Sequence, residues 1–166
     1  MPEYMDIYDE HRNRTGRIWQ RRVPMQPGDW HLVVYAWLVN SKGEVLLTQR
    51  HSDKTWPGYW ECTAGGVQAG ETSLEGALRE LREEIGVVKQ PEEGILLQQA
   101  LDTGVFIDFW LFRSDVSLSD LILQPTEVVD AKWVSREEYE AMCGKGVIVP
   151  SCTDFYEWIR EREIQL

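Results

Sequence analysis

Apolar and polar residues alternate in short runs along much of the chain, which predicts a sheet. Residues 30–40, WHLVVYAWLVN, are rich in β-branched and aromatic side chains and predict a central strand that ends at the turn NSKGE. Residues 44–50 follow that turn closely and predict its antiparallel partner. A Pro-Gly loop then leads to a brief strand that ends on glycines, two strands are expected around residues 102–104, and DAKWVS predicts another.

The first 27 residues form a separate element in this pattern. Residues 3–24 alternate in polarity around NRTG, where Asn13 and Gly16 supply turn chemistry. We therefore expect an N-terminal β-hairpin or extended arm over residues 1–27. Such an arm leaves open a homodimer in which it exchanges between subunits.

Three segments carry the periodicity of helices. The first is expected to begin near Thr72 or Ser73, where a hydroxyl can cap the helix, and to end at Gly86. The apolar stripe of this helix is expected to pack on the sheet and consists of Leu74, Ala77, Leu78, Leu81 and Ile85. REEYEAM predicts a short helix capped by Ser135, and residues 151–164 predict a last helix with inward-facing Phe155, Trp158, Ile159 and Ile164. Strands mixed with such helices indicate one layered α/β domain over residues 1–166.

Composition narrows the function classes. The chain has 166 residues, 43% of them hydrophobic, which suits a single core that needs no disulfide or structural zinc. The formal net charge of -11 opposes binding to nucleic acid polymers, whose phosphates are contacted by clustered Lys and Arg. No apolar run approaches the roughly 20 residues that span a membrane, and the N-terminus lacks a signal-peptide core, so a cytoplasmic protein without a membrane partner is expected. Cys62, Cys143 and Cys152 match no zinc spacing and are expected to be reduced thiols.

The first predicted helix crowds carboxylates onto one side. With about 100° per residue, Glu83 lies about -60° and Glu84 about +40° from Glu80, so the three carboxylate heads are expected to meet at one point. Like charges at this spacing destabilise a helix, and no lysine lies on that sector. A divalent cation, Mg²⁺ or Mn²⁺, is therefore expected between them. Arg79 and Glu71 are interpreted as a bracing pair that supports this cluster.

These glutamates stand in the stretch from Gly65 to Val87, GGVQAGETSLEGALRELREEIGV, whose spacing resembles the complete signature of the Nudix hydrolase family. The resemblance implies an α/β/α sandwich with a mixed β-sheet. It implies a hydrolase that uses Mg²⁺ or Mn²⁺ to cleave nucleoside diphosphates linked to another moiety, or related pyrophosphates. It also implies a supporting salt bridge between Glu71 and Arg79, and a set of metal ligands consisting of the Gly65 carbonyl, Glu80, Glu83 and Glu84.

Hydrolysis of a phosphoanhydride needs charge neutralisation on the phosphate oxygens and a carboxylate that takes a proton from water. Glu80 is one candidate for that base. Glu127 is another, because members of the family often place an extra acid at this point. Arg50 and Lys54, which lie close to the glycine strand in sequence, are candidate phosphate contacts. The expected substrate is a small diphosphate, and a nucleoside diphosphate or nucleotide-linked molecule is favoured.

Two other functions stay open. The sequence around the glutamates also resembles the branch that contains isopentenyl-diphosphate isomerase and its hydrolase-like relatives. In that alignment Ala64 stands at the catalytic cysteine of the isomerase and Gly66 at its neighbouring histidine, with Cys62 two residues early, so hydrolysis is favoured. His31 aligns with a metal-binding histidine of the isomerases, although a lone histidine at a strand start is more often structural. The other alternative is a nucleotide-binding module without catalysis, and such relatives usually lose glutamates that this chain retains.

Some side chains carry a weaker signal. Glu75 lies on the outer face of the predicted helix and is interpreted as a solvated charge. Four aromatic side chains could stack a nucleobase but are more typical of core or loop packing: Trp56, Trp60, Phe106 and Trp110.

Overall fold

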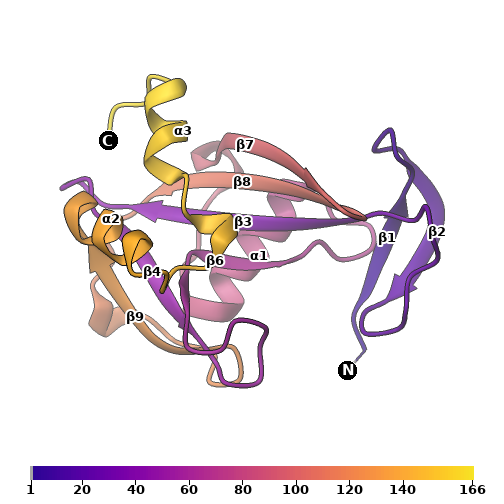
Figure 1. Ribbon diagram of the computed structural model, residues 1–166, viewed down its shortest axis with the longest axis horizontal. Coiled ribbons are helices and arrows are strands. Elements are labelled where there is room, and N and C mark those ends of the chain that lie inside the picture. Colours follow the sequence, from indigo (N-terminus) through magenta and orange to yellow (C-terminus); the bar gives the residue numbers. More distant parts are fainter. Residues whose placement is uncertain (1) are drawn as a thin grey trace.

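The structure is a computed structural model that describes residues 2–166 (Figure 1). Its strands are β1 (Tyr4–Tyr8), β2 (Arg14–Gln20), β3 (His31–Val39), β4 (Val45–Arg50), β5 (Trp60–Glu61), β6 (Thr63–Gly66), β7 (Ile95–Asp102), β8 (Val105–Arg113) and β9 (Val128–Val134). Its helices are α1 (Ser73–Ile85), α2 (Arg136–Gly144) and α3 (Phe155–Glu161), with the 3₁₀ turns η1 (Pro91–Glu93), η2 (Leu118–Asp120) and η3 (Pro150–Cys152). Within residues 2–166, every helix is too short or too polar to cross a lipid bilayer.

A mixed seven-stranded sheet forms the middle layer, in the order β5-β4-β3-β8-β7, with β6 paired to β3 and β9 paired to β4. β3 is central, as predicted, and lies parallel to β8 and antiparallel to β6. The predicted antiparallel partner β4 meets β3 at the pair Val39–Val45. β4 then pairs with β5 and β9 instead, which leaves the edge of β3 to β6.

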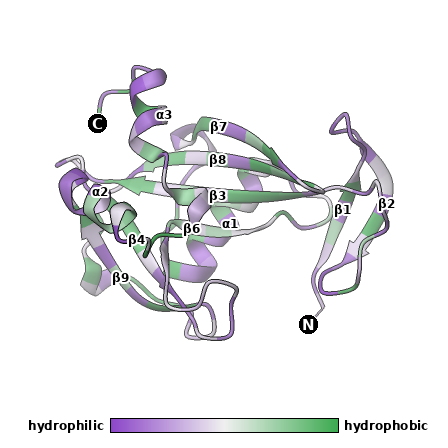
Figure 2. Cartoon of the chain, viewed as in Figure 1, coloured by the Kyte–Doolittle hydropathy of each residue, from purple (hydrophilic) through white to green (hydrophobic). Residues whose placement is uncertain are grey.

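Two apolar cores lie on opposite faces of this sheet because side chains of β3 alternate between the faces. One core joins the apolar stripe of α1 to four residues of β3: Leu32, Val34, Ala36 and Leu38. The other core joins Trp37 and Val39 to side chains of α2 and α3. These three layers confirm the predicted α/β/α sandwich, and Figure 2 shows that β3 and β8 between the helices are largely hydrophobic.

Helix α1 has the limits that the sequence predicted. Thr72 caps its first turn, and Gly86 ends it in the left-handed conformation, with φ 74. Glu75, interpreted above as a solvated charge, has a structural partner: its carboxylate accepts a hydrogen bond from the Thr72 N–H at 2.7 Å. This reciprocal capping box fixes the start of the helix that carries the three glutamates.

The N-terminal hairpin is present, but its turn lies earlier than the sequence predicted. β1 and β2 pair along their lengths, and the chain reverses over residues 9–13. There Asp9 Oδ1 accepts hydrogen bonds from the N–H groups of His11 and Asn13. Gly16, predicted in the turn, lies inside β2 with φ +80. An aspartate that bonds to its own backbone closes this turn in place of glycine.

The last helix is shorter than predicted. Residues 150–152 form η3, and α3 begins at Phe155 and ends at Glu161. Phe155 and Ile159 are buried, while Trp158 and Ile164 pack partly buried against the same core. The inward-facing residues were therefore predicted correctly, although Ile164 reaches the core from beyond the helix end.

Replacement of Leu81 by Ala should destabilise the fold by about 2–5 kcal/mol, because Leu81 is fully buried between α1 and the sheet and its removal leaves a cavity. Urea unfolding followed by circular dichroism measures the loss. Leu78→Ala is the matched control, because Leu78 lies on the same helix and is partly exposed. Equal losses for the two variants would contradict this description of the core.

Candidate active site

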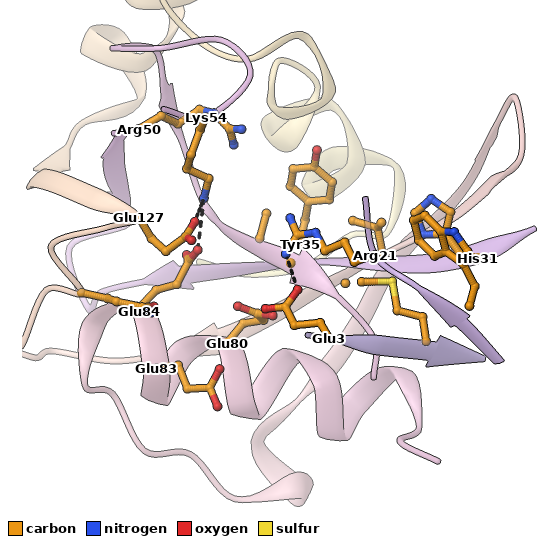
Figure 3. Close-up of a pocket in the computed structure, with 17 residues that line it drawn as sticks. Glu3, Arg21, His31, Tyr35, Arg50, Lys54, Glu80, Glu83, Glu84 and Glu127 are labelled. Atoms are coloured by element: carbon orange, nitrogen blue, oxygen red, sulfur yellow. Dashed lines mark hydrogen bonds and ion pairs between the residues drawn. The ribbon is translucent and has the colours of Figure 1, made fainter. Parts of the chain in front are cut away.

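A pocket of about 210 Å³ lies between the N-terminal hairpin, β6 and α1 (Figure 3). Its lining also includes Gly65 from β6. The structure thus brings into one pocket six acidic or basic residues that the sequence singled out: Arg50, Lys54, Glu80, Glu83, Glu84 and Glu127. They come from the end of β4, the loop after it, α1 and the segment before β9, which are far apart in sequence.

Gly65 allows α1 to approach β6 closely. A Cβ atom at this position would lie 2.0 Å from Glu80 Oε1 and 2.1 Å from its Cδ, closer than real atoms come. Glu80 therefore occupies space that any other residue at position 65 would fill. Gly66 leaves similar room for the hairpin, because a Cβ there would lie 2.0 Å from Met5 Cε.

Arg79 is the central cation of the α1 cluster. Its Nε lies 2.8 Å from Glu71 Oε1, which is the ion pair that the sequence predicted. Its Nη1 lies 2.7 Å from Glu80 Oε1 and 3.2 Å from Glu83 Oε2, and its Nη2 donates to the Gly66 carbonyl at 2.7 Å. One guanidinium thus ties the loop before α1, the helix itself and β6 together.

Lys54 is the second cation, and it enters the carboxylate cluster from the loop after β4. Its Nζ lies 2.8 Å from Glu127 Oε2, 3.3 Å from Glu84 Oε1 and 3.8 Å from Glu61 Oε1. Burial alone would lower the pKa of Lys54, but these three carboxylates outweigh it and raise the pKa. The ammonium is therefore charged and neutralises part of the acidic pocket.

Glu61 is a buried site residue that the sequence analysis missed. It lies on β5 with 2% exposure, and Arg50 Nη1 donates to both of its carboxylate oxygens at 2.5 Å. Arg50 also donates to the carbonyl and hydroxyl oxygens of Thr55. The sequence contains one signal for this residue: a glutamate in the brief strand WEC, with Arg50 and Lys54 shortly before it. A buried charged glutamate needs a cation as its partner.

Burial shifts the protonation of the pocket carboxylates. It raises the pKa of Glu84 to about 8 despite the opposing charge of Lys54, and Glu84 is 2% exposed. It also raises the pKa of Glu80, against the charge of Arg79. Glu84 Oε2 is buried and has no hydrogen-bond partner among residues 2–166. This oxygen is an unsatisfied acceptor inside the pocket.

The three α1 carboxylates do not meet at one point, contrary to the expectation from helix spacing. Within the described part of the chain, no three His, Cys, Asp or Glu side chains are grouped closely enough to hold a metal ion. Glu80 and Glu83 turn to Arg79. Glu84 turns to Lys54, as Figure 3 shows. The three like-charged glutamates point apart, and each pairs with a cation of the protein. Arg79 lies on the same helix, whereas Lys54 comes from the loop after β4.

His31 lies at the far end of the pocket from Glu84 and Glu127 (Figure 3). Its ring contacts Trp19 of the hairpin, with 5.2 Å between the ring centroids. Its Nδ1 is buried without a hydrogen-bond partner in residues 2–166, and burial together with the charge of Arg21 lowers its pKa. His31 therefore belongs to the wall that the hairpin and β3 form, apart from those two carboxylates.

Cys62 lies outside the pocket lining, in the core beneath α2 and α3. Its Sγ is 3.9 Å from Cys152 Sγ, and burial raises the pKa of its thiol well above the ordinary value. Ala64, at the position of the isomerase cysteine in the sequence comparison, does line the pocket. The site thus has an alanine where that chemistry would need a thiol.

The four aromatic residues considered for base stacking lie outside this lining. Phe106 and Trp110 pack in the α1-side core, Trp60 packs in the other core, and Trp56 is 47% exposed on the loop after β4. The aromatic side chains that do line the pocket are Trp19 and Tyr35. Neither residue was predicted, because the sequence pattern shows the hairpin as a separate element and β3 as a core strand.

Comparisons with known proteins agree with the observed fold. The family model described as NUDIX domain matches residues 29–151. The chain is 38% identical over 151 residues to a Nudix hydrolase of Listeria monocytogenes, lmo0368, with 89% of each protein covered. It is 34% identical over 110 residues to an isopentenyl-diphosphate Delta-isomerase of Escherichia coli, which covers 62% of this chain and 60% of that protein. The crystal structure of DR0079 from Deinococcus radiodurans matches with a TM-score of 0.74 and 26% identity, over 96% of this chain and 98% of that one.

The buried Glu84 predicts a pH dependence of stability. Because its pKa rises from 4.5 to about 8 in the folded protein, its contribution to stability is fully present below pH 4.5 and is lost as the pH rises toward 8. In protein treated with EDTA, Glu84→Gln should therefore gain stability over the wild type between pH 5 and 8, by up to about 1.4 kcal/mol per pH unit.

Urea unfolding at a series of pH values measures that gain. Glu83→Gln is the control, because the Glu83 side chain is 45% exposed and lies on the same helix. A stability difference between Glu84→Gln and the wild type that stays constant from pH 5 to 8 would contradict the buried, protonated Glu84.

Proposed function

Because the chain belongs to the Nudix family of hydrolases, we propose that it hydrolyses a phosphoanhydride bond in a small diphosphate substrate. The favoured substrate is a nucleoside diphosphate or a nucleotide-linked diphosphate, and the proposed cofactor is Mg²⁺ or Mn²⁺. One observation carries this proposal: the pocket keeps Glu84 2% exposed, with Oε2 lacking a hydrogen-bond partner in residues 2–166. Burial of an unsatisfied carboxylate oxygen costs folding free energy. A cation or a proton that binds there during the reaction would offset that cost.

The oxygen donors are of the type that a hard divalent cation prefers, but Glu80 and Glu83 pair with Arg79 and Glu84 pairs with Lys54, so these side chains would have to turn to share one ion. Carboxylates of Glu80, Glu83 and Glu84 and the carbonyl of Gly65 supply oxygen ligands, which Mg²⁺ and Mn²⁺ prefer. The unsatisfied Glu84 Oε2 is an acceptor without a competing donor in the described chain. When bound, such a cation supplies charge neutralisation on the phosphate oxygens.

The remaining residues have distinct proposed roles. Arg79 and Glu71 fix the start of α1 against β6 and so position the glutamates. Lys54 carries a fixed positive charge at the pocket lining and is the proposed phosphate contact. Arg50 is a weaker candidate for that contact, because Glu61 and Thr55 already accept its hydrogen bonds.

A carboxylate must take the proton from the attacking water. Burial raises the pKa of Glu80, which makes its carboxylate a better proton acceptor than an exposed one. Glu127 is the alternative, because its side chain is 33% exposed and lies beside Lys54. The pH profile of kcat/KM for Glu80→Gln and Glu127→Gln separates the two, because the variant without the base loses the acidic limb of the profile.

The isomerase is the second candidate, since an isomerase of that branch is among the relatives. The alanine at position 64 and the buried Cys62 disfavour it. A turnover panel distinguishes the candidates: nucleoside diphosphates, sugar nucleotides, dinucleotides and isoprenoid diphosphates with Mg²⁺ or Mn²⁺. Release of phosphate or nucleoside monophosphate supports the hydrolase, and proton exchange into isopentenyl diphosphate without phosphate release supports the isomerase. Absence of both, with ligand binding retained, supports a binding module.

Glu83→Gln and Glu84→Gln should each lower metal-dependent turnover by about 100-fold or more, because each removes a negative charge from the proposed metal ligands. Steady-state kinetics with the substrate found in the panel measures the loss. Glu75→Gln is the matched control on the same helix, because glutamine retains the capping box with Thr72. Retained activity in both site variants would contradict the proposed metal-dependent mechanism.

Gly65→Ala should also lower turnover, by about 10- to 100-fold, because the added Cβ displaces Glu80 from its place beside β6. Gly144→Ala is the control, since a Cβ at position 144 meets no atom within 4 Å. Thermal unfolding of both variants shows whether the loss of turnover arises without global unfolding. Wild-type turnover in folded Gly65→Ala would contradict the proposed place of Glu80.

A further inference from the structure

The N-terminal hairpin forms one wall of the active-site pocket, although it precedes residues 29–151 that match the family model. Arg21, directly after β2, and Glu3, directly before β1, both line this pocket. Figure 3 shows the Arg21 side chain extending from the hairpin toward the carboxylate side of the pocket. The hairpin thus presents a cation to the site from a direction that α1 and the β4 loop do not cover.

Hydrogen bonds hold the hairpin against the loop that precedes α1. The N–H of Ala69 donates to the Tyr4 carbonyl at 2.8 Å, and the N–H of Gly70 donates to Asp6 Oδ2 at 2.9 Å. At the turn of the hairpin, Arg12 pairs with the buried Asp108 of β8 at 2.5 Å. These contacts fix the hairpin relative to the α1 glutamates, so Arg21 stands on a rigid support.

The pocket cations differ in how strongly the protein already uses them. The Arg50 side chain is 11% exposed and bonded to Glu61, and the Lys54 side chain is 13% exposed with three carboxylates within 3.8 Å. Arg21 pairs with Glu3 at 2.6 Å, and both side chains are 44% exposed. An ion pair with this exposure contributes little to stability. Among the described residues of the lining, Arg21 is therefore the cation that a ligand can recruit at least cost.

The positive charge of Arg21 interacts with carboxylates of the pocket. Burial lowers the pKa of Arg21, but its hydrogen bond with Glu3 and the charges of Glu3, Glu127 and Glu80 outweigh that effect and raise it. Arg21 thus lies within electrostatic reach of carboxylates on the opposite side of the pocket. A guanidinium offers paired N–H donors that match two phosphate oxygens.

We propose that Arg21 is a substrate-binding residue, whose guanidinium binds the diphosphate from the hairpin side of the pocket, opposite the α1 glutamates. Glu3 holds the guanidinium in the lining until the diphosphate replaces it as the acceptor. This inference rests on the proposed function, because it takes the diphosphate as the substrate class named there. It adds a recognition element that belongs to the N-terminal hairpin.

The test is calorimetric binding of imidodiphosphate, a diphosphate analogue that resists hydrolysis, in the presence of Mg²⁺. Arg21→Ala should weaken binding by about 10- to 100-fold, the size of one charge-assisted hydrogen bond or a bidentate pair. Arg21→Lys should recover part of the affinity, because it keeps the charge and loses the paired donors. Glu3→Gln should bind at least as tightly as the wild type, because it removes the competing carboxylate.

Arg22→Gly is the matched control. It removes the neighbouring positive charge at an exposed residue outside the pocket lining, where φ is 73 and glycine introduces no strain. Its affinity for imidodiphosphate should stay within about twofold of the wild type, since salt screens an exposed charge that does not contact the ligand. Thermal unfolding of each variant identifies any that fails to fold.

The outcomes separate this inference from the proposed function. Equal affinities for folded Arg21→Ala and Arg22→Gly overturn the role of Arg21. A wild type that does not bind imidodiphosphate overturns it as well. In either case, turnover of the diphosphate panel would still support the hydrolase. Binding that depends on Arg21, in a wild type that turns over no diphosphate, supports the recognition role and counts against the hydrolase.

Discussion

Carboxylates buried in and beside the candidate active-site pocket are the constraint on which this structure depends. Glu61 and Glu84 are each 2% exposed, and the Glu80 side chain is 12% exposed. A buried carboxylate that is charged and unpaired costs several kcal/mol. The chain meets this cost with cations from different elements, Arg79 on α1 and Lys54 on the loop after β4, and for Glu84 also with a proton, because its pKa rises to about 8. The same contacts fix where those elements lie relative to one another.

The packing of α1 and of the N-terminal hairpin against β6 is correspondingly close. Positions 65 and 66 carry no side chain, because the Glu80 carboxylate and the Met5 methyl group occupy the space where a Cβ would stand. β3 supports the layers on both faces of the sheet, since its alternating side chains contribute to the α1-side core and to the opposite core. The glutamates are therefore carried by a helix whose position is set by buried apolar contacts on one side and by Arg79 on the other. Rigid support of this kind is what a preorganised site requires.

The sequence predicted the parts of the fold that depend on local patterns. The limits of α1, its apolar stripe and the central strand follow from side-chain periodicity and capping residues within a few positions. Helix angles also placed Glu80, Glu83 and Glu84 on one sector, but angles say nothing of partners from other segments. Lys54 reaches Glu84 across 30 positions of the sequence.

The other differences have similar causes. Glu61 lies in a strand of two residues, too short for periodicity to reveal its direction. The hairpin turn closes through the Asp9 side chain and includes Asn13, whereas the prediction from Asn13 and Gly16 placed the turn too late in the sequence. The wall formed by Trp19 and Arg21 depends on how the hairpin docks, and that docking uses hydrogen bonds to residues 69 and 70, which no local pattern encodes.

Charge explains why the cations of the pocket come from separate elements. The chain carries a formal net charge of -11, so an anionic ligand is repelled at a distance and must be held by a few placed positive charges. Arg79 is bound to three carboxylates and to the Gly66 carbonyl, which leaves its guanidinium committed to the architecture. A lysine is a point charge on a flexible stem, so Lys54 can exchange a carboxylate for a phosphate oxygen without a planar fork to realign. The protein thus combines one cation that is committed to the architecture, Arg79, with one that pairs with buried carboxylates and can exchange one of them for a phosphate, Lys54.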